Sequence, residues 1–385
     1  MNFEFSEEQK MIQSMTRDFA EKEVAPRATD DDRKGEVPRD LIDKMKPLGF
    51  FGAFLPKEYG GGGFDNLSYA LMMEEIGRAS QSVRTIISSH TSLFSKSIVE
   101  FGNPEQKKKY LPKAAAGDLI GCLATTEPNV GSDISSIETT AQKKGNRWII
   151  NGRKIWITNG GIAGAALIFA KTDKTKGKRG ITAFIVERGT PGFSSFESQD
   201  KLGLRASSNA ELVFQDCEVP DENILGEPGG GYQIALAAFN RARMSVGAAC
   251  VGLGQACIDA SVRYAQIRKQ FGHPIGKFQF IQKMIVDMRV EIEAARLMVY
   301  RAAYLKDNGI PNTVETSMAK YYASEAALRA ATNAIQIHGG YGLSKDYPVE
   351  RYYRDARALT ILEGTSQMHQ LIIGRDTIGI SAITL

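Results

Sequence analysis

Residues 147–158 read RWIINGRKIWIT, a short run rich in isoleucine and tryptophan, and this run indicates the fold class of the middle of the chain. Aromatic and β-branched residues favour strands because they pack well on a pleated surface. Asn151-Gly152 divides the run into RWII and RKIWIT. Since Asn-Gly between two such segments is the strongest short-range signal for a β-hairpin, we predict two antiparallel strands that turn at Asn151-Gly152.

More strand-like segments follow this predicted hairpin. They are ALIFA (166–170), ITAFIVE (181–187) and ELVFQDCEV (211–219), and glycine, proline, aspartate and lysine residues separate them. No helix-length periodicity lies between them, which disfavours the helical crossovers of a parallel βαβ sheet. We therefore predict an antiparallel β domain over residues 121–230.

Helical patterns lie on both sides of this region. Ser6 and Gln9 have the spacing of a capping box at the start of a first helix. The sequence thus predicts an α+β protein with a helical domain before the sheet (1–120) and another after it (231–385). The expected helical segments are 40–48, 67–79, 83–101, 232–268, 277–307 and 313–338.

Composition excludes several classes of protein. The 385 residues are 43% hydrophobic and 24% charged, as in ordinary globular proteins. A net charge of +4 is too small to indicate a nucleic-acid-binding surface. The four cysteines show no CxxC spacing and the four histidines no HExxH, so we predict neither a disulfide framework nor a metal site. No run approaches the ~18 apolar residues of a membrane span, and no signal or transit pattern is visible, so we expect a cytoplasmic protein.

One acid stands out in the C-terminal region. ALTILEGTSQMHQ (358–370) contains Glu363 and no other charged residue. A buried carboxylate is unfavourable unless something compensates it, so this residue is a candidate for chemistry. The alternative is an ordinary glutamate at the surface end of a helix.

Four other segments could hold a ligand. ATTEPNVGSD (124–133) would offer backbone N–H groups and hydroxyls to a phosphate or a ring edge, or it could be an ordinary polar turn. Trp156 and Thr158 share one face of their strand and could contact a flat heterocycle, although a core tryptophan is the alternative. YAQIRKQFG (264–272) and QIHGGYG (336–342) complete the set, and Gly339-Gly340 could be only a helix C-cap. The absence of Gly-x-Gly-x-x-Gly after a strand excludes a Rossmann-type nucleotide site.

In this order, the five motifs resemble the acyl-CoA dehydrogenase family over essentially the whole chain. The resemblance implies an N-terminal helical domain, a middle β domain and a C-terminal four-helix bundle. It also implies FAD as cofactor, a homotetramer built as a dimer of dimers, and an electron-transfer flavoprotein as electron acceptor.

The resemblance also assigns cofactor contacts. Trp156 and Thr158 match residues beside the flavin ring, and Arg268 and Phe271 match a segment that reaches the FAD of a neighbouring subunit. Gln270 stands where some members have threonine. The expected FAD contacts are Leu123, Thr125, Thr126, Ser132, Trp156, Ile157, Thr158, Arg268, Gln270, Phe271, Gln279, Gln336, Gly339, Gly340, Thr365 and Gln367.

By the same resemblance, Glu363 is the catalytic base that removes the α-proton of an acyl-CoA thioester. The expected substrate contacts are Arg84, Thr85, Ser132, Asn240, Arg243 and Gly364. Arg84 is the only formal charge between Arg78 and Lys96, so it either extends along the surface or awaits an anion.

Arg84 resembles the arginine with which glutaryl-CoA dehydrogenases hold the distal carboxylate of their substrate. The decarboxylating members carry tyrosine where this chain has Leu362, and a second glutamate where it has Gly77. We therefore expect α,β-dehydrogenation of a short dicarboxylic acyl-CoA, glutaryl-CoA or a 2-substituted succinyl-CoA such as benzylsuccinyl-CoA, without loss of CO2. The alternatives are a butyryl-CoA type dehydrogenase, an acyl-CoA oxidase and a non-catalytic scaffold.

Overall fold

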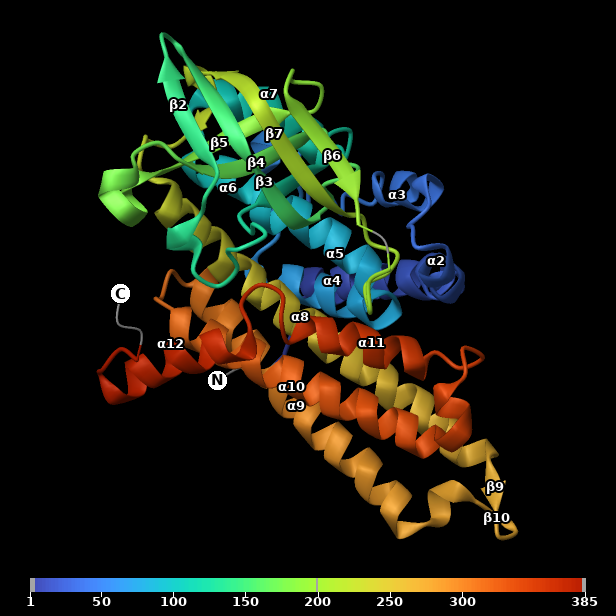
Figure 1. Cartoon of the computed structure of the whole chain (residues 1–385). Helices are drawn as coiled ribbons and strands as arrows, with labels where there is room; N and C mark the ends of the chain where they lie inside the picture. Colours follow the sequence, from blue (N-terminus) through green and yellow to red (C-terminus); the bar gives the residue numbers. More distant parts are fainter. Residues whose placement is uncertain (1–3, 199, 383–385) are drawn as a thin grey trace.

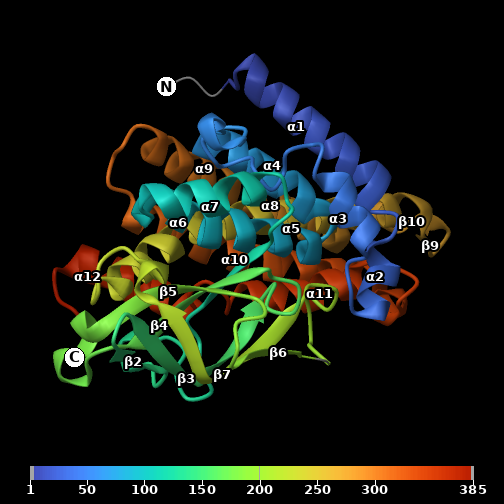
Figure 2. The ribbon, with the colours of Figure 1, turned by 90° about the horizontal axis from the view of Figure 1, so that it is seen from above.

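The computed structural model describes residues 4–198 and 200–382 and shows helices, then a sheet, then helices along the chain (Figure 1). The predicted α+β class is confirmed. Figure 2 shows the sheet on one side of the helical body and the first helix on the opposite side.

The N-terminal region begins with the predicted capping box. The Ser6 hydroxyl accepts from the Gln9 N–H at 3.2 Å, and the Gln9 side chain accepts from the Ser6 N–H at 3.0 Å. The polar stretch before Pro38 contains a short helix that the apolar periodicity did not reveal. The helices of this region are α1 (Glu7–Phe19), η1 (Ala20–Val24), α2 (Ala28–Lys34), α3 (Arg39–Met45), η2 (Lys57–Tyr59), α4 (Asn66–Ala79), α5 (Gln81–Ser88), η3 (Ser89–Ser95), α6 (Lys96–Phe101) and α7 (Pro104–Ala115).

The helical pattern over residues 83–101 is three segments rather than one. Its middle segment, η3, is π-helical. Such wide turns are rare and often occur at functional sites, because they shift the side chains around the helix axis. Here the shift begins directly after α5, the helix that carries Arg84 and Ser88.

The middle region forms one eight-stranded sheet in the order β6-β7-β3-β2-β4-β5-β8, with β1 paired to β4. The predicted antiparallel arrangement is wrong at two places, since β1–β4 and β2–β4 are parallel. The chain from β1 to β4 passes through the β2–β3 hairpin, so a parallel pair arises without a crossover helix. The strands are β1 (Gly121–Ala124), β2 (Thr140–Lys144), β3 (Arg147–Thr158), β4 (Ala165–Lys171), β5 (Ile181–Glu187), β6 (Phe193–Glu197), β7 (Asn209–Pro220) and β8 (Ile224–Leu225), with the 3₁₀ turns η4 (Ile134–Ser136), η5 (Lys174–Gly180) and η6 (Asp221–Asn223).

The predicted hairpin turn at Asn151-Gly152 is wrong. β3 runs straight through these residues, and the chain turns earlier, at Gly145-Asn146, where Lys144 pairs with Arg147. Asn151-Gly152 instead forms an irregularity opposite β7. The Asn151 amide accepts from the Asp216 N–H at 2.8 Å and donates to its carboxylate at 3.1 Å. The dipeptide is therefore used for a bulge, which also tolerates glycine.

Both faces of the sheet are buried. Along β4, Leu167 belongs to a cluster with helical residues, and Ile168 belongs to a cluster made by the sheet itself. Trp148 on β3 contacts Phe184 on β5 with ring centroids 5.6 Å apart, although two strands separate β3 from β5. The sheet therefore curves over its own second face, while α6, α7 and the start of α8 cover the first.

The C-terminal region is dominated by three long helices, of which α8 is central to the molecule. It packs against α4, α9 and α10, and it reaches strand β5. By length and composition α8 could cross a membrane, but 83% of its most apolar window is buried within the protein, as in a core helix. The elements are α8 (Gly231–Ile267), β9 (Lys269–Gln270), β10 (His273–Pro274), η7 (Ile275–Lys277), α9 (Gln279–Asp307), α10 (Thr313–His338), η8 (Gly339–Leu343), α11 (Val349–Leu359) and α12 (Ser366–Ile378).

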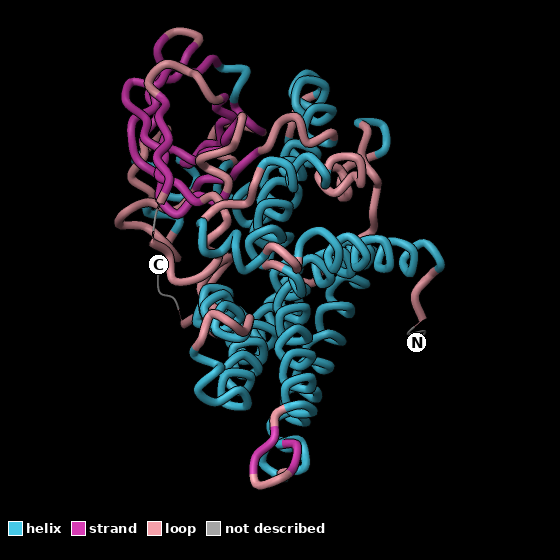
Figure 3. The backbone as a smooth tube through the Cα atoms, turned by 90° about the vertical axis from the view of Figure 1, so that its right-hand side faces the viewer, coloured by secondary structure: helices cyan, strands magenta, loops and turns pink. Residues whose placement is uncertain are grey.

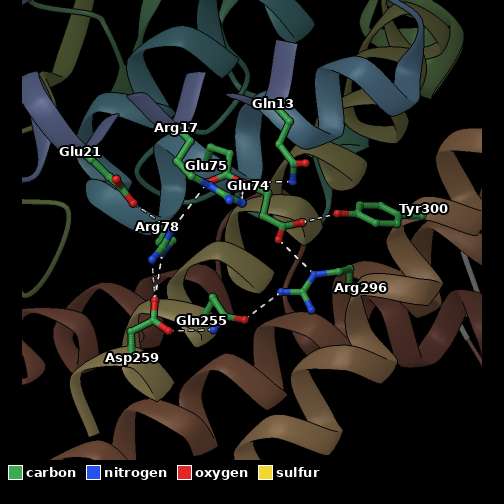
Figure 4. Close-up of polar contacts among 10 residues, drawn as sticks. All are labelled: Gln13, Arg17, Glu21, Glu74, Glu75, Arg78, Gln255, Asp259, Arg296 and Tyr300. Carbon is green, nitrogen blue, oxygen red and sulfur yellow. Dashed lines mark hydrogen bonds and ion pairs between the residues drawn. The ribbon is translucent and has the colours of Figure 1, made fainter. Parts of the chain in front are cut away.

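A buried polar network joins the first and last regions (Figure 4). Glu74 on α4 accepts from Arg296 at 3.1 Å and from Tyr300 at 2.8 Å, both on α9. Its neighbour Glu75 accepts from Arg17 on α1 at 2.6 and 3.0 Å. Buried charges need such partners, and these contacts therefore fix α1 and α4 against the bundle.

Candidate active site

Glu363 belongs to the loop between α11 and α12. This loop lies on the side of the helical body that faces the sheet (Figure 1). The φ of Glu363 is 56°, in the left-handed region, and the following Gly364 has a φ of 99°. A left-handed backbone is rare for a residue with a side chain, and such strain concentrates at functional sites. Thr365 then caps α12 by accepting from the Met368 N–H at 3.3 Å.

The Glu363 carboxyl group is enclosed although the residue as a whole is half-buried. Its Oε2 atom is buried and has no hydrogen-bond partner in the described part of the chain. Burial raises the pKa of this carboxyl, while the nearby charges of Arg84, Lys320 and Arg243 act in the opposite direction. Cations from three helices therefore act on one carboxylate and oppose the effect of its burial.

Lys320 on α10 was missed by the sequence analysis. It is fully buried, and its ammonium donates to the Gly364 carbonyl at 2.7 Å. Burial lowers the pKa of this ammonium to about 8. The sequence did contain one signal for this residue. Lys320 stands among the alanines of α10, on the helix face that is buried.

Arg84 on α5 is 1% exposed, so the surface interpretation is wrong. Its guanidinium donates to the side-chain oxygen of Gln81 and to the Ser88 hydroxyl, each at 3.2 Å. Both partners are neutral, and the Arg84 Nε has none among the described residues. Burial lowers the pKa of the guanidinium, and the Cys250 thiol and Glu363 oppose this effect.

The other expected substrate residues differ in where they lie. Arg243 and Gly364 are beside Glu363, whereas Asn240 and Thr85 make hydrogen bonds elsewhere. Arg243 faces Glu363, and its buried Nε is also without a partner in residues 4–198 and 200–382. Gly364 adjoins both, since a Cβ added there would lie 3.9 Å from the Arg243 Nε. Asn240 lies three residues before Arg243 on α8 and contacts Asn312 at 3.4 Å. The Thr85 hydroxyl donates to the Gln81 carbonyl at 2.7 Å, a bond within α5.

The segment 124–133 is fixed by a buried ion pair. Lys154 on β3 lies 2.7 Å from Glu127, and both side chains are at most 1% exposed. The Glu127 carboxylate also accepts from the backbone N–H groups of Glu138 and Thr139, while Lys154 donates to the Thr125 carbonyl at 3.3 Å. The pair thus holds the loop that carries Thr126 and Ser132, which are partly and fully exposed.

Trp156 is not a core residue, because 60% of it is exposed. A second irregularity of β3 between Lys154 and Ile157 places Trp156 at a φ of 59°. Thr158 is half-buried, and Ile157 points into the core of the sheet, as does Leu123 on β1 toward the helices. The side chains of Trp156 and Thr158 therefore remain available to a ligand.

Several of the remaining expected FAD contacts lie at the far tip of the helical bundle, whereas Thr365 and Gln367 lie close to Glu363 in the sequence. β9 and β10 form the tip of the bundle, at the opposite end from the sheet (Figure 3). A cavity of about 680 Å³ there is lined by Arg268, Gln270, Gly339 and Gly340, among others. Phe271 beside it is 91% exposed. Gln279, Gln336 and Gln367 are exposed as well, and Gln367 follows Thr365 at the other site.

The tip offers the groups that bind a nucleotide diphosphate. Arg268 lies over the Tyr341 ring at 5.7 Å. Gly339 is the C-cap of α10, as the alternative interpretation held, yet a Cβ added at Gly339 or Gly340 would meet nothing within 4 Å. A cation, an uncrowded glycine backbone and an aromatic ring suit a phosphate-bearing cofactor.

Comparison with known proteins identifies the family. Residues 6–118, 122–217 and 229–378 match the N-terminal, middle and C-terminal domains of acyl-CoA dehydrogenases.

The chain belongs to the acyl-CoA dehydrogenase family.

The relatives support this at high coverage. An acyl-CoA dehydrogenase of Bacillus subtilis is 47% identical over 97% of this chain and 99% of its own length. A short-chain specific acyl-CoA dehydrogenase of Clostridium acetobutylicum is 45% identical over 97% of this chain and 98% of its own. As a member of the family, the chain is a flavin-dependent oxidoreductase with FAD as cofactor.

Solved structures of the acyl-CoA dehydrogenase fold superpose closely. Butyryl-CoA dehydrogenase from Megasphaera elsdenii gives a TM-score of 0.96 at 43% identity, covering 98% of this chain and 100% of that one. A glutaryl-CoA dehydrogenase complex with glutaryl-CoA gives 0.95 at 40%, covering 98% and 97%. A chain in the structure of an electron transferring flavoprotein of Acidaminococcus fermentans gives 0.96 at 45%, covering 98% and 100%. Because both butyryl and glutaryl enzymes are similar, the comparisons leave the acyl group open.

Proposed function

We propose that this chain oxidises an acyl-CoA thioester to the trans-2-enoyl-CoA with Glu363 as the general base. The buried, unpartnered Oε2 of Glu363 among three cations is the observation that carries the proposal. Bound FAD supplies the oxidising power by accepting hydride from the β carbon. A carboxylate whose pKa is raised by burial is a better base for the weakly acidic α-proton. A non-catalytic scaffold would have no use for this group.

Charge development at the thioester oxygen needs a donor. The Glu363 N–H is suited to this role, because the left-handed backbone at Glu363 turns its amide away from a regular helical pattern. Thr126, Ser132, Trp156 and Thr158 would hold the flavin end of the cofactor. The chain's own part in the reaction is thus proton removal, orientation of the thioester and exclusion of water.

For the acyl group, we propose a short dicarboxylic substrate. Arg84 is buried with only neutral partners, so a carboxylate of the substrate would satisfy it with charge-assisted hydrogen bonds. Leu362 supplies no hydroxyl, and Gly77 cannot become glutamate without a clash, since its Cβ would lie 2.9 Å from the Ala249 Cα. These two positions support the proposal of oxidation without loss of CO2.

A butyryl-CoA type substrate is the second candidate, favoured by the similarity to short-chain enzymes. The test is turnover of glutaryl-CoA, a 2-substituted succinyl-CoA and butyryl-CoA with an artificial acceptor and with O2. Arg84→Gln should weaken the diacid thioesters by ~2–5 kcal/mol, the range for losing one partner of a buried charge pair, and should spare butyryl-CoA. If the wild type prefers butyryl-CoA and Arg84→Gln lowers turnover of all three equally, the dicarboxylic proposal is wrong. Fast turnover with O2 alone would favour an oxidase.

We also propose that the protein works as a homotetramer in the cytoplasm and passes electrons to an electron-transfer flavoprotein. The support is that the expected FAD contacts of one chain fall at two separate places, and that Phe271 at the tip is exposed. Arg268→Ala should then lower the FAD content of the purified oligomer, measured by absorbance. A monomer that binds one FAD per chain would contradict this assembly.

A further inference from the structure

Lys320 contacts the backbone directly after Glu363. Its ammonium donates to the Gly364 carbonyl at 2.7 Å, while no part of the residue is exposed. Glu363 and Gly364 both have positive φ, so this carbonyl belongs to a strained segment. Strain of this kind persists only where the surroundings over-determine the conformation.

Other restraints on this loop lie on both sides of Gly364. The N–H groups of Ile361 and Leu362 donate to the Ala358 carbonyl at 3.0 and 3.1 Å. The Ser366 N–H donates to the Thr360 carbonyl at 3.0 Å, and Thr365 caps α12. The buried His369 ring also lies against Gly364, where an added Cβ would be 3.2 Å from Nε2. Lys320 lies outside the loop, on α10, and therefore ties the strained segment to a separate helix.

We propose that Lys320 is a positioning residue for the catalytic base, because it fixes the Gly364 carbonyl and places a positive charge beside Glu363. This inference rests on the proposed function, in which Glu363 is the base. A lysine buried for packing alone would be unfavourable, since an apolar side chain of similar length fills the same space without desolvating a charge. Lys154 provides the contrast, since it lies directly against the carboxylate of Glu127.

The charges around Glu363 determine in which direction its pKa should change when the Lys320 charge is removed. Arg84 on α5, Arg243 on α8 and Lys320 on α10 favour its ionised form, and the neutral His369 on α12 lies close by. Cys250, Arg243 and Glu325 also act on Lys320. Loss of the Lys320 charge leaves two cations at Glu363, so the pKa of the carboxyl should rise further. The base would then need a higher pH to be ionised.

The experiment measures the rate of flavin reduction by substrate between pH 5 and 9 in the FAD-loaded enzyme. Lys320→Met removes the donor and the charge, whereas Lys320→Gln keeps an N–H donor without charge. Lys306→Met is the matched control, because Lys306 is a half-buried lysine with a buried ammonium whose pKa is lowered to about 8, and it is not among the charges that act on Glu363. FAD content and binding of a non-oxidisable acyl-CoA analogue are measured on each variant.

For Lys320→Met we expect the acidic limb of the rate profile to move up by about 1 pH unit, and the plateau rate to fall at least ~10-fold. Analogue binding and FAD content should stay near the wild-type values. Lys320→Gln should show the same shift of the limb with a higher plateau, and Lys306→Met should show neither change. Should Lys320→Met fail to fold, the shift of the limb in Lys320→Gln decides.

A wild-type profile in Lys320→Met or in Lys320→Gln would overturn the inference, and so would an equal shift in Lys306→Met. The proposed function is tested separately with Glu363→Gln. If Glu363→Gln reduces flavin at the wild-type rate, the proposed function fails. If Glu363→Gln is inactive while both Lys320 variants behave as wild type, only the role of Lys320 fails.

Discussion

Two unfavourable states coincide at the scale of a single residue, Glu363: a left-handed backbone, and a buried carboxylate oxygen that has no partner in the part of the chain that the structure describes. Arg84 and Arg243 are similar, since each has a buried Nε that no described residue satisfies. Buried polar atoms without a partner among the described residues need an explanation, and the proposed substrate would provide one for these three groups.

Glu363→Gln should retain FAD and acyl-CoA binding but lose turnover by ~10²–10⁴-fold or more, because the amide has nearly the same shape and cannot accept a proton. Flavin bleaching by substrate in a stopped-flow instrument measures this. Glu315→Gln, which changes a partly exposed acid on α10 paired with Arg301, is a control that should keep wild-type turnover.

The sequence motif made Glu363 a candidate catalytic base, and this remains a prediction, but no motif pointed to Lys320. A charge within an alanine-rich helix gives no sign of its partner, and this partner is a backbone carbonyl 44 residues away. For the same reason, Arg84 could be a surface residue or a buried one until its neighbours were known. Trp156 was ambiguous because the irregularity that exposes it depends on the register with β7.

At the scale of elements, helices were predicted more accurately than the sheet. The α8, α9 and α10 boundaries lie within two residues of the expected segments, because apolar periodicity and the breaks at Pro274 and Pro311 are local signals. Strand pairing is not local. The predicted turn at Asn151-Gly152 and the prediction of a wholly antiparallel sheet were wrong, since both depend on which distant strand lies alongside.

The Lys154–Glu127 pair links β3 to the 124–133 loop, and its loss should weaken both stability and cofactor retention. Lys154→Met leaves the Glu127 carboxylate buried without its counter-charge, which typically costs ~3–5 kcal/mol. Thermal unfolding and FAD content measure the effect. The double variant Lys154→Met/Glu127→Gln should recover part of the stability, and equal losses in the single and double variants would contradict the pairing argument.

At the scale of the whole molecule, three buried clusters share α8 or the sheet, so the regions are one packed body rather than separate units. His90 lies between them. Its ring nitrogens contact the Ala114 carbonyl and the Gly121 N–H, each at 3.0 Å, and the ring is fully buried. Burial lowers the pKa of this imidazole to about 4.

Below pH 6.5 the unfolded His90 binds a proton that the folded one refuses until about pH 4, so its contribution to stability falls as the pH drops through this window. The loss reaches about 3 kcal/mol at the lower end. Asp355 acts in the opposite direction, because burial raises the pKa of its carboxyl to about 6. His90→Gln should therefore reduce the loss of stability between pH 7 and 5, measured by urea unfolding at both values. An unchanged difference would exclude His90 as a cause.

The four cysteines are distributed evenly over this body. Cys122 and Cys217 lie in the sheet, Cys250 and Cys257 lie on α8, and all four are buried and unpaired. Burial raises the pKa of each thiol, so neither access nor ionisation permits rapid alkylation in the native state. The chain thus carries two pairs of cysteines that can report local opening, one pair in the sheet and one pair on α8. Alkylation at one common rate would mean that the sheet and the helical core open together, and separate rates would give the opening free energy of each.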